Sequence, residues 1–315
     1  MVRIDDPSSL VEAALHGDRR ALARLISMVE DHHGGAGEVL ALLYPRAGRG
    51  YVVGLTGAPG SGKSTLTDQL IRHLRGLGEE VAVVAVDPSS PFSGGAILGD
   101  RVRMQDHVSD PGVYIRSLAS RGHLGGLSEA TPKAVAILDA VGKPYVLVET
   151  VGIGQAELEI VESADTTVVV LNPGWGDSIQ ANKAGLLEIA DVFVVNKADR
   201  SGLPGTVRDL KQMLQLGEKK PWTPPIVPVV ATEGKGVPEA WEAIQGHRRH
   251  LEGSGELRQR RQERARRELQ RALSQAVGRR AGEGAGEDRI AELLQAVQER
   301  RLDPWSAAEK ILADG

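Results

Sequence analysis

The order of apolar and polar residues changes twice along the chain and divides it into three parts. In residues 1–48, apolar residues such as Leu22 and Leu25 recur at helical spacing, which predicts amphipathic helices. From residue 49 to 250, short apolar runs alternate with amphipathic segments. Helical spacing returns in residues 251–315, first in an arginine-rich stretch. The pattern predicts a central domain between an N-terminal helical extension and a C-terminal helical segment.

The apolar runs of the central domain predict the strands of a sheet. Most of them are rich in β-branched residues and apolar on both faces, as in parallel strands that helices cover on both sides. The runs are Tyr51–Thr56, Val81–Val86, Tyr145–Val148, Thr166–Leu171, Val192–Val195 and Ile226–Val230. Because amphipathic segments separate them, the predicted fold class is α/β, with a doubly wound, mostly parallel sheet.

Composition narrows the classes of function. The 315 residues include no cysteine, which excludes disulfides, zinc thiolate sites and thiol catalysis. A net charge of −4 disfavours a general nucleic-acid binder. The chain shows no secretory signal and no run of about 18 apolar residues. We therefore expect a cytoplasmic location, with neither a nucleic acid nor a membrane as partner.

Residues 57–64 match the phosphate-loop pattern G-x-x-x-x-G-K-[ST] at every fixed position. A strand is predicted before them and a helix after them, a context that makes a chance glycine-rich turn a poor alternative. Backbone N–H groups of such a loop and the positive end of the following helix bind phosphate oxygens. The predicted nucleotide-binding residues here are Gly57, Ala58, Pro59, Gly60, Ser61, Gly62, Lys63, Ser64 and Thr65. Lys63 is expected to contact the outer phosphates in catalysis, and the Ser64 hydroxyl to bind Mg²⁺. The central domain is thus predicted to be a P-loop NTPase.

A second motif, N-K-A-D at residues 196–199, directly follows a predicted strand. The Asp199 carboxylate can accept hydrogen bonds from the ring N–H and the exocyclic amine of guanine, a pair of donors that adenine lacks. Asn196 can bridge the base and the phosphate loop. The predicted base-binding residues are Asn196, Lys197, Asp199, Ala231 and Thr232. A surface turn is the alternative, but the position of the motif after a strand favours GTP as the nucleotide.

Residues that follow two other predicted strands are candidates for Mg²⁺ binding and hydrolysis. Glu149 ends one strand and could hold Mg²⁺, usually through water. Gly152 could donate its N–H to the γ-phosphate, and Gln155 could orient the attacking water. Asp87 ends another strand, and Asp100 follows a segment rich in Ser, Pro and Gly; both could bind Mg²⁺ or a nucleophilic water. The alternatives are that Glu149 is an ordinary strand-end carboxylate and that Asp87 and Asp100 cap turns.

With these motifs, the chain resembles the MeaB/ArgK family of GTPases associated with methylmalonyl-CoA mutase, which includes the methylmalonic aciduria type A protein. The resemblance covers nearly the whole chain, with its motifs in the family's order. The matching stretches are GAPGSGKST (57–65), VDPSSP (86–91), GGAILGDRVRM (94–104), ETVGIGQAE (149–157), NPGWGDSIQANKAG (172–185), NKAD (196–199) and DPWSAAEKI (303–311).

The resemblance implies a function and a partner. Members of the family hydrolyse GTP with Mg²⁺ and act as chaperones for adenosylcobalamin-dependent acyl-CoA mutases, gating cofactor loading and protecting the mutase. It implies that Asp177, Gln180 and Lys183 belong to a loop that responds to the mutase, with Lys183 a candidate catalytic residue beside Lys63. It further implies that residues 251–315 form a dimerisation arm, so that a homodimer is expected. The chain itself shows no evident cobalamin site.

Two other functions compete with this one. One is a nucleotide-dependent kinase associated with an arginine/ornithine transport system, for which the sequence offers no protein-substrate site. The other is a metallochaperone GTPase that inserts nickel. The absence of cysteine and of clustered histidine disfavours nickel, which imidazole and thiolate ligands suit.

Overall fold

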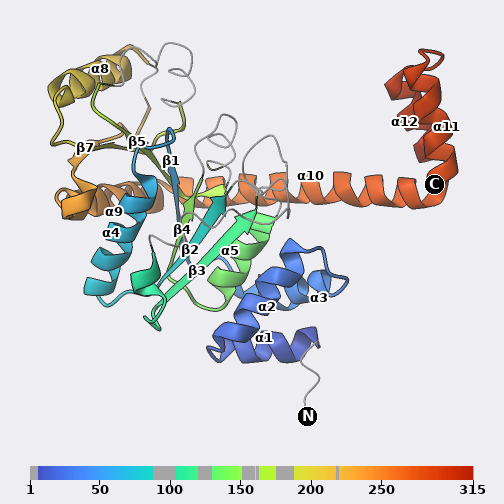
Figure 1. Cartoon of the computed structure of the whole chain (residues 1–315), viewed down its shortest axis with the longest axis horizontal. Helices are drawn as coiled ribbons and strands as arrows, with labels where there is room; N and C mark the ends of the chain where they lie inside the picture. Colours follow the sequence, from blue (N-terminus) through green and yellow to red (C-terminus); the bar gives the residue numbers. More distant parts are fainter. Residues whose placement is uncertain are drawn as a thin grey trace. The chain divides into compact units, whose positions relative to one another are not determined.

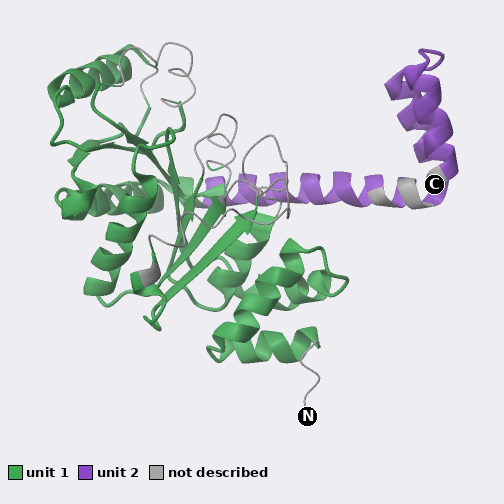
Figure 2. Ribbon diagram, viewed as in Figure 1, with its two compact units in different colours: residues 1–257 green, residues 258–315 purple. Residues whose placement is uncertain are grey.

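The computed structural model divides the chain into two compact units, residues 1–257 and 258–315 (Figure 2). The first unit contains the sheet and the N-terminal helices, and the second is helical. The residues that the structure describes are 6–87, 104–119, 130–150, 160, 163–174, 188–217 and 220–314. In this part of the chain, no helix combines the length and the apolar character needed to cross a membrane.

A seven-stranded sheet forms the centre of the first unit, and all of its paired strands run parallel (Figure 1). The strand order is β3-β2-β4-β1-β5-β6-β7, which is the order of a doubly wound sheet in which β1 is central. The strands are β1 (Tyr51–Thr56), β2 (Val81–Asp87), β3 (Val113–Ala119), β4 (Tyr145–Glu149), β5 (Thr166–Leu171), β6 (Val192–Asn196) and β7 (Ile226–Val229). The predicted α/β fold class is therefore confirmed.

Alternate strand residues point to opposite faces of the sheet, where the described residues form one apolar core on one face and two on the other. On one face, α4 (Lys63–Gly76) and α9 (Val237–Ser254) pack against side chains such as Val53 and Val168. On the other face, α5 (Ala130–Ala140) covers β2 and β4, and α8 (Leu203–Leu216) covers β5 and β6. Because both faces of the sheet are buried, the strands are apolar at successive positions rather than at every second one.

The N-terminal helices share the core that lies under α5. Leu25 and Ile26 of the second helix are fully buried in that core. The helices are α1 (Pro7–Leu15), α2 (Arg19–Glu30) and α3 (Ala36–Leu43), followed by the short η1 (Tyr44–Arg46). The chain then enters β1 through Gly48, Arg49 and Gly50, whose three backbone N–H groups donate to the Asp139 carboxylate of α5. The N-terminal segment is thus tied to the sheet by packing and by hydrogen bonds.

The second unit consists of helices that leave apolar side chains exposed. Its elements are most of α10 (Glu256–Ala285), then α11 (Glu287–Gln298) and α12 (Pro304–Asp314). Leu293 and Ala307 are buried where α11 packs against α12. Leu269 and Leu273 of α10 remain 69% and 60% exposed.

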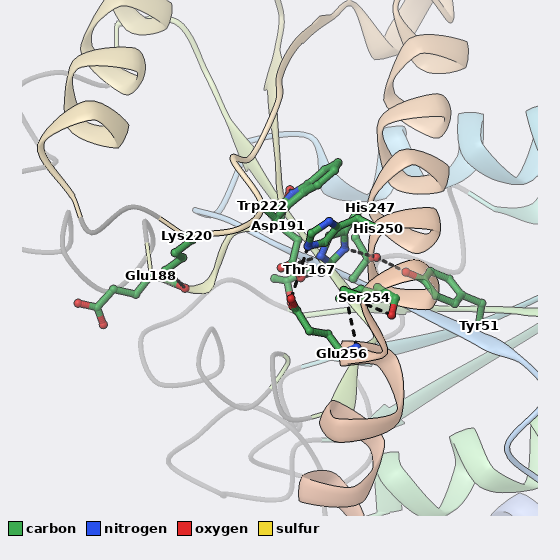
Figure 3. A network of polar contacts seen from close by, with 12 residues as sticks. Tyr51, Thr167, Glu188, Asp191, Lys220, Trp222, His247, His250, Ser254 and Glu256 are labelled. Carbon is green, nitrogen blue, oxygen red and sulfur yellow. Dashed lines mark hydrogen bonds and ion pairs between the residues drawn. The ribbon is translucent and has the colours of Figure 1, made fainter.

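A buried polar network joins three strands at the amino edge of the sheet (Figure 3). Tyr51 Oη lies 2.6 Å from Thr166 Oγ1, which lies 2.8 Å from His247 Nδ1. Burial raises the pKa of the Tyr51 phenol well above its usual range, so this phenol stays protonated in its contact with Thr166. His247 Nε2 then faces Asp191 Oδ1 at 3.3 Å, and Asp191 Oδ2 accepts the N–H of Thr167 at 2.8 Å.

The strands that this network joins are β1, β5 and β6. At their carboxyl ends, the same strands lead to the phosphate loop, to Asn172 and to the N-K-A-D motif. The indole of Trp222 extends the network, because its N–H donates to the backbone oxygen of Asp191 at 2.8 Å. The network thereby fixes α9 and the start of β6 against the strands that position the two predicted nucleotide motifs.

Candidate nucleotide-binding site

The described candidate residues gather at the carboxyl edge of the sheet. The phosphate loop follows β1, Glu149 ends β4, and the N-K-A-D motif begins at the last residue of β6. Because all the strands are parallel, their carboxyl ends meet at one edge, which is where open α/β sheets bind ligands. The fold therefore brings together residues that lie more than a hundred positions apart in the chain.

The phosphate loop requires glycine at two positions. Gly57 has a φ of 140°, and a Cβ there would lie 2.1 Å from the backbone oxygen of Val170. Gly62 has a φ of 93°, and a Cβ there would lie 2.2 Å from Asn196 Nδ2. Gly62 is also the N-cap of α4 and has no side chain to cap the helix. No N-cap side chain therefore occupies the first-turn N–H groups of α4, and these are the groups with which helix N-termini bind phosphate.

Lys63 is buried, with its side chain curled over the loop. Its Nζ donates to the backbone oxygens of Gly57 at 2.7 Å and of Ala58 at 3.2 Å. The ammonium group is therefore held inside the loop. There, the phosphate oxygens of a bound nucleotide are expected to accept hydrogen bonds from it, in addition to these carbonyl oxygens or in their place.

The N-K-A-D motif is hydrogen-bonded to the phosphate loop. Asn196 Nδ2 donates to the backbone oxygen of Ser61 at 2.8 Å, and Asn196 Oδ1 accepts the N–H of Ala231 at 3.1 Å. Lys197 Nζ donates to the backbone oxygen of Gly60 at 2.6 Å. These contacts join the three segments that the sequence assigns to the nucleotide. Contact of the segments with the base itself stays a prediction.

Asp199 and Thr232 are exposed at this edge, whereas Asn196 and Ala231 are buried. Lys235 lies close to Asp199, and its Nζ is 2.5 Å from Glu233 Oε2. The hydrogen bond that Lys235 donates to Glu233, with a smaller contribution from the Asp199 charge, raises the pKa of Lys235 above its usual value. The predicted base-binding carboxylate thus lies beside a pair of opposite charges on the exposed rim.

Glu149 is a buried carboxylate that two hydroxyl groups of α4 contact. Ser64 Oγ donates to its Oε1 at 2.6 Å, and Thr67 Oγ1 donates to its Oε2 at 2.9 Å. In the register of the sheet, Glu149 lies beside Ala85 of β2, and Asp87 is the last residue of that strand. The backbone thus brings two of the predicted magnesium acids to neighbouring strand ends.

Several predicted site residues lie outside the part of the chain that the structure describes. They are Asp100, Gly152, Gln155, Asp177, Gln180 and Lys183. Two residues that sequence reasoning missed contact the site instead: Thr67, and Asn172, whose Nδ2 donates to the backbone oxygen of Gly60 at 3.4 Å. Thr67 lies three positions after Ser64 on a predicted helix, a spacing that places both on one face and could have indicated it.

The parallel sheet, with a phosphate loop between β1 and α4, defines a P-loop nucleotide-binding protein of the α/β class. The family model described as methylmalonyl Co-A mutase-associated GTPase MeaB matches residues 22–285, and the chain belongs to this family.

Individual relatives agree with this assignment. A protein of Pyrococcus abyssi is 48% identical over 309 residues, which cover 97% of this chain and 95% of that protein. The GTPase ArgK of Escherichia coli is 36% identical over 258 residues, covering 79% and 78%. A crystal structure described as LAO/AO transport system kinase is similar with a TM-score of 0.71 and 28% identity, over 97% of this chain and 96% of that one. The chain is accordingly a GTPase.

Proposed function

We propose that this GTPase is a chaperone of an adenosylcobalamin-dependent acyl-CoA mutase, whose cofactor loading it gates and which it protects. The observation that carries the proposal is the match of residues 22–285 to the mutase-associated family. In this proposal, GTP binding and hydrolysis switch the chaperone between two states, and the mutase is the partner that responds to the change of state. The chain needs no cobalamin site of its own for this role.

The proposed chemistry uses Mg²⁺ together with GTP. Oxygen donors are what Mg²⁺ prefers, and the Ser64 hydroxyl and the Glu149 carboxylate supply them 2.6 Å apart. When bound, the ion neutralises charge on the phosphates. Asp87 and Asp100 are proposed to complete this acidic group. The phosphate loop would bind the β- and γ-phosphates through its amides and Lys63.

Hydrolysis itself is assigned to residues that follow β2 and β4. We propose that Gln155 or Asp100 orients the attacking water, and that the N–H of Gly152 contacts the γ-phosphate and is released when that group leaves. Asp199, Asn196 and the backbone at Ala231 would select guanine. In the sequence, each of these residues either ends a strand of the sheet or follows one.

The mutase is expected to accelerate GTP hydrolysis, which should be slow in the free protein. The proposed contact is the predicted loop of residues 174–185, in which Asp177, Gln180 and Lys183 supply charge and hydrogen-bonding groups. A cation brought to the phosphates by a partner can stabilise the transition state, as activating arginines do. Steady-state turnover of the wild type and of Lys183→Ala, each with and without methylmalonyl-CoA mutase, measures this. We expect similar basal rates and stimulation only of the wild type.

The two possible failures of this experiment separate the two ideas. Full stimulation of Lys183→Ala by the mutase would remove this lysine from the mechanism and leave the chaperone role intact. If no cobalamin-dependent acyl-CoA mutase stimulates the wild type, the chaperone role is wrong, while the GTPase activity stands.

We also propose that the protein works as a homodimer joined through residues 251–315. Leu269, Leu273 and Val277 are spaced four apart on α10, so they form one exposed apolar stripe. A second copy would bury such a stripe symmetrically. Leu273→Glu should therefore convert the dimer to a monomer in light scattering. Gln275→Glu adds the same charge on the opposite side of the helix and should leave the dimer intact; a dimer of unchanged strength in both variants would place the interface elsewhere.

A further inference from the structure

We propose that Thr67 is a positioning residue that fixes the second oxygen of the Glu149 carboxylate, and so sets how tightly the nucleotide site binds Mg²⁺. The inference rests on the proposed role of Glu149 toward the ion. It adds a residue to that site which neither the phosphate-loop pattern nor the N-K-A-D motif contains. Thr67 does not touch the nucleotide in this role; it acts through Glu149.

The geometry holds the carboxylate at both oxygens from one helix. Ser64 Oγ lies 2.6 Å from Oε1 of Glu149, and Thr67 Oγ1 lies 2.9 Å from Oε2. Ser64 and Thr67 are three residues apart in α4, so the helix presents both hydroxyls on the face that meets the end of β4. Because α4 is packed on the sheet through fully buried leucines, the backbone that carries both hydroxyls is fixed relative to the end of β4.

Burial makes these hydrogen bonds necessary. Glu149 is 2% exposed and Thr67 is 0% exposed. A carboxylate removed from water in this way is costly unless donors replace the lost solvent. Loss of a hydroxyl that contacts one of its oxygens therefore changes the environment of a charge, and hydrogen bonds to charged groups are about twice as strong as neutral ones.

The length of the glutamate side chain explains why a second donor is needed. Glutamate has one more rotatable bond than aspartate, and its terminal torsion is broad, so a single hydrogen bond leaves the plane of the carboxylate undefined. Ser64 can donate its proton to Oε1 and still present a lone pair to a cation. Thr67 then fixes Oε2, and the two contacts together define the direction in which the carboxylate faces the ion or its water shell.

The Thr67 hydroxyl has a second acceptor within reach. Its Oγ1 is also 3.0 Å from the backbone oxygen of Lys63, one helical turn earlier. A hydroxyl carries one proton, so Thr67 donates either to Glu149 or to this carbonyl at any moment. Helical threonines commonly use that backbone acceptor, and the charge of Glu149 is what favours the outward bond.

The test measures the linkage between Mg²⁺ and nucleotide rather than activity alone. A fluorescent GDP analogue is titrated into the full chain, once with Mg²⁺ and once with EDTA, and the ratio of the two dissociation constants is the linkage. Thr67→Val keeps the size and β-branching of threonine but removes the donor. We expect it to lower the linkage about tenfold, through the dissociation constant measured with Mg²⁺ only. The half-saturating Mg²⁺ concentration for hydrolysis should rise by a similar factor.

Two further variants separate positioning from folding. Thr67→Ser retains the hydroxyl and should keep most of the wild-type linkage. Thr131→Val removes a buried threonine hydroxyl of α5 and should leave the linkage unchanged. If Thr67→Val does not fold, Thr67→Ala provides the same loss of the donor in a smaller side chain. A wild-type linkage in a folded Thr67→Val or Thr67→Ala protein would overturn the inference.

A double-mutant cycle with Glu149 distinguishes failure of this inference from failure of the proposed metal role. Glu149→Gln should abolish most of the linkage, and adding Thr67→Val to it should change nothing further. If Glu149→Gln retains the wild-type linkage, Glu149 does not hold the ion and the proposed metal site is wrong. If Glu149→Gln loses the linkage while Thr67→Val keeps it, the metal role of Glu149 stands and Thr67 is only a packed side chain.

Discussion

Replacement of Lys63 by alanine is expected to lower GTP hydrolysis on the order of a thousandfold. The ammonium group supplies charge that opposes the negative charge developing on the phosphates in the transition state. In the structure it donates to the backbone oxygens of Gly57 and Ala58, which hold it inside the loop. The alanine variant therefore loses a positive charge that the loop already holds in position.

The same contacts predict a second effect of Lys63→Ala. Because the Lys63 side chain also links two carbonyl groups of the loop, its removal should weaken GTP binding as well as slow turnover. Single-turnover hydrolysis at saturating GTP separates the two effects, and circular dichroism reports whether the fold is retained. Lys211→Ala removes an exposed lysine of α8 and serves as the control. Hydrolysis by Lys63→Ala at the wild-type rate would mean that the loop is not the catalytic phosphate site.

The strands could be predicted closely because burial on both faces leaves them a continuous apolar sequence. The run Tyr51–Thr56 coincides with β1, and the other predicted runs differ from their strands by one residue at most. The exception is β3, which was not predicted, because Arg116 and Ser117 interrupt its apolar run. In the structure β3 is an edge strand, and Arg116 Nη2 is 2.6 Å from Glu30 Oε2 of α2. A polar strand residue whose charge is paired by a helix distant in the sequence gives no local indication of a strand.

Contacts of the site could be predicted where they follow from the residues of a sequence motif. They could not be predicted where they arise from tertiary packing. The sequence predicted that Asn196 bridges toward the phosphate loop, and the structure shows its hydrogen bond to Ser61. The contact between Thr67 and Glu149 spans 82 positions and depends on how α4 lies on the sheet. Helical spacing could place Thr67 on the same face as Ser64, but it could not identify Glu149 as the partner. For the same reason the sequence could not reveal the hydrogen bond of Lys197 to Gly60.

Asp199→Asn is expected to exchange the base preference of the site. The carboxylate should accept two hydrogen bonds from guanine, and its replacement by an amide should cost GTP binding about 2–4 kcal/mol, or roughly 30- to 1000-fold in affinity. Xanthosine triphosphate carries a carbonyl where guanine carries its amine, so the introduced amide complements it and its affinity should rise. Asp209→Asn changes the same groups on the exposed face of α8 and should alter neither affinity.

The size of this effect depends on how the base completes the site. Asp199 is exposed in the structure, so its carboxylate is solvated and costs little free energy. The backbone that carries it is nevertheless fixed, because Asn196 and Lys197 are hydrogen-bonded to the phosphate loop. A bound base must therefore displace water from a carboxylate whose backbone is held in place. Only a base with two matching donors replaces the hydrogen bonds to water that the carboxylate loses. Competition of GTP, ATP and xanthosine triphosphate against a fluorescent nucleotide measures this directly, and equal affinity of the wild type for ATP and GTP would show that Asp199 does not select the base.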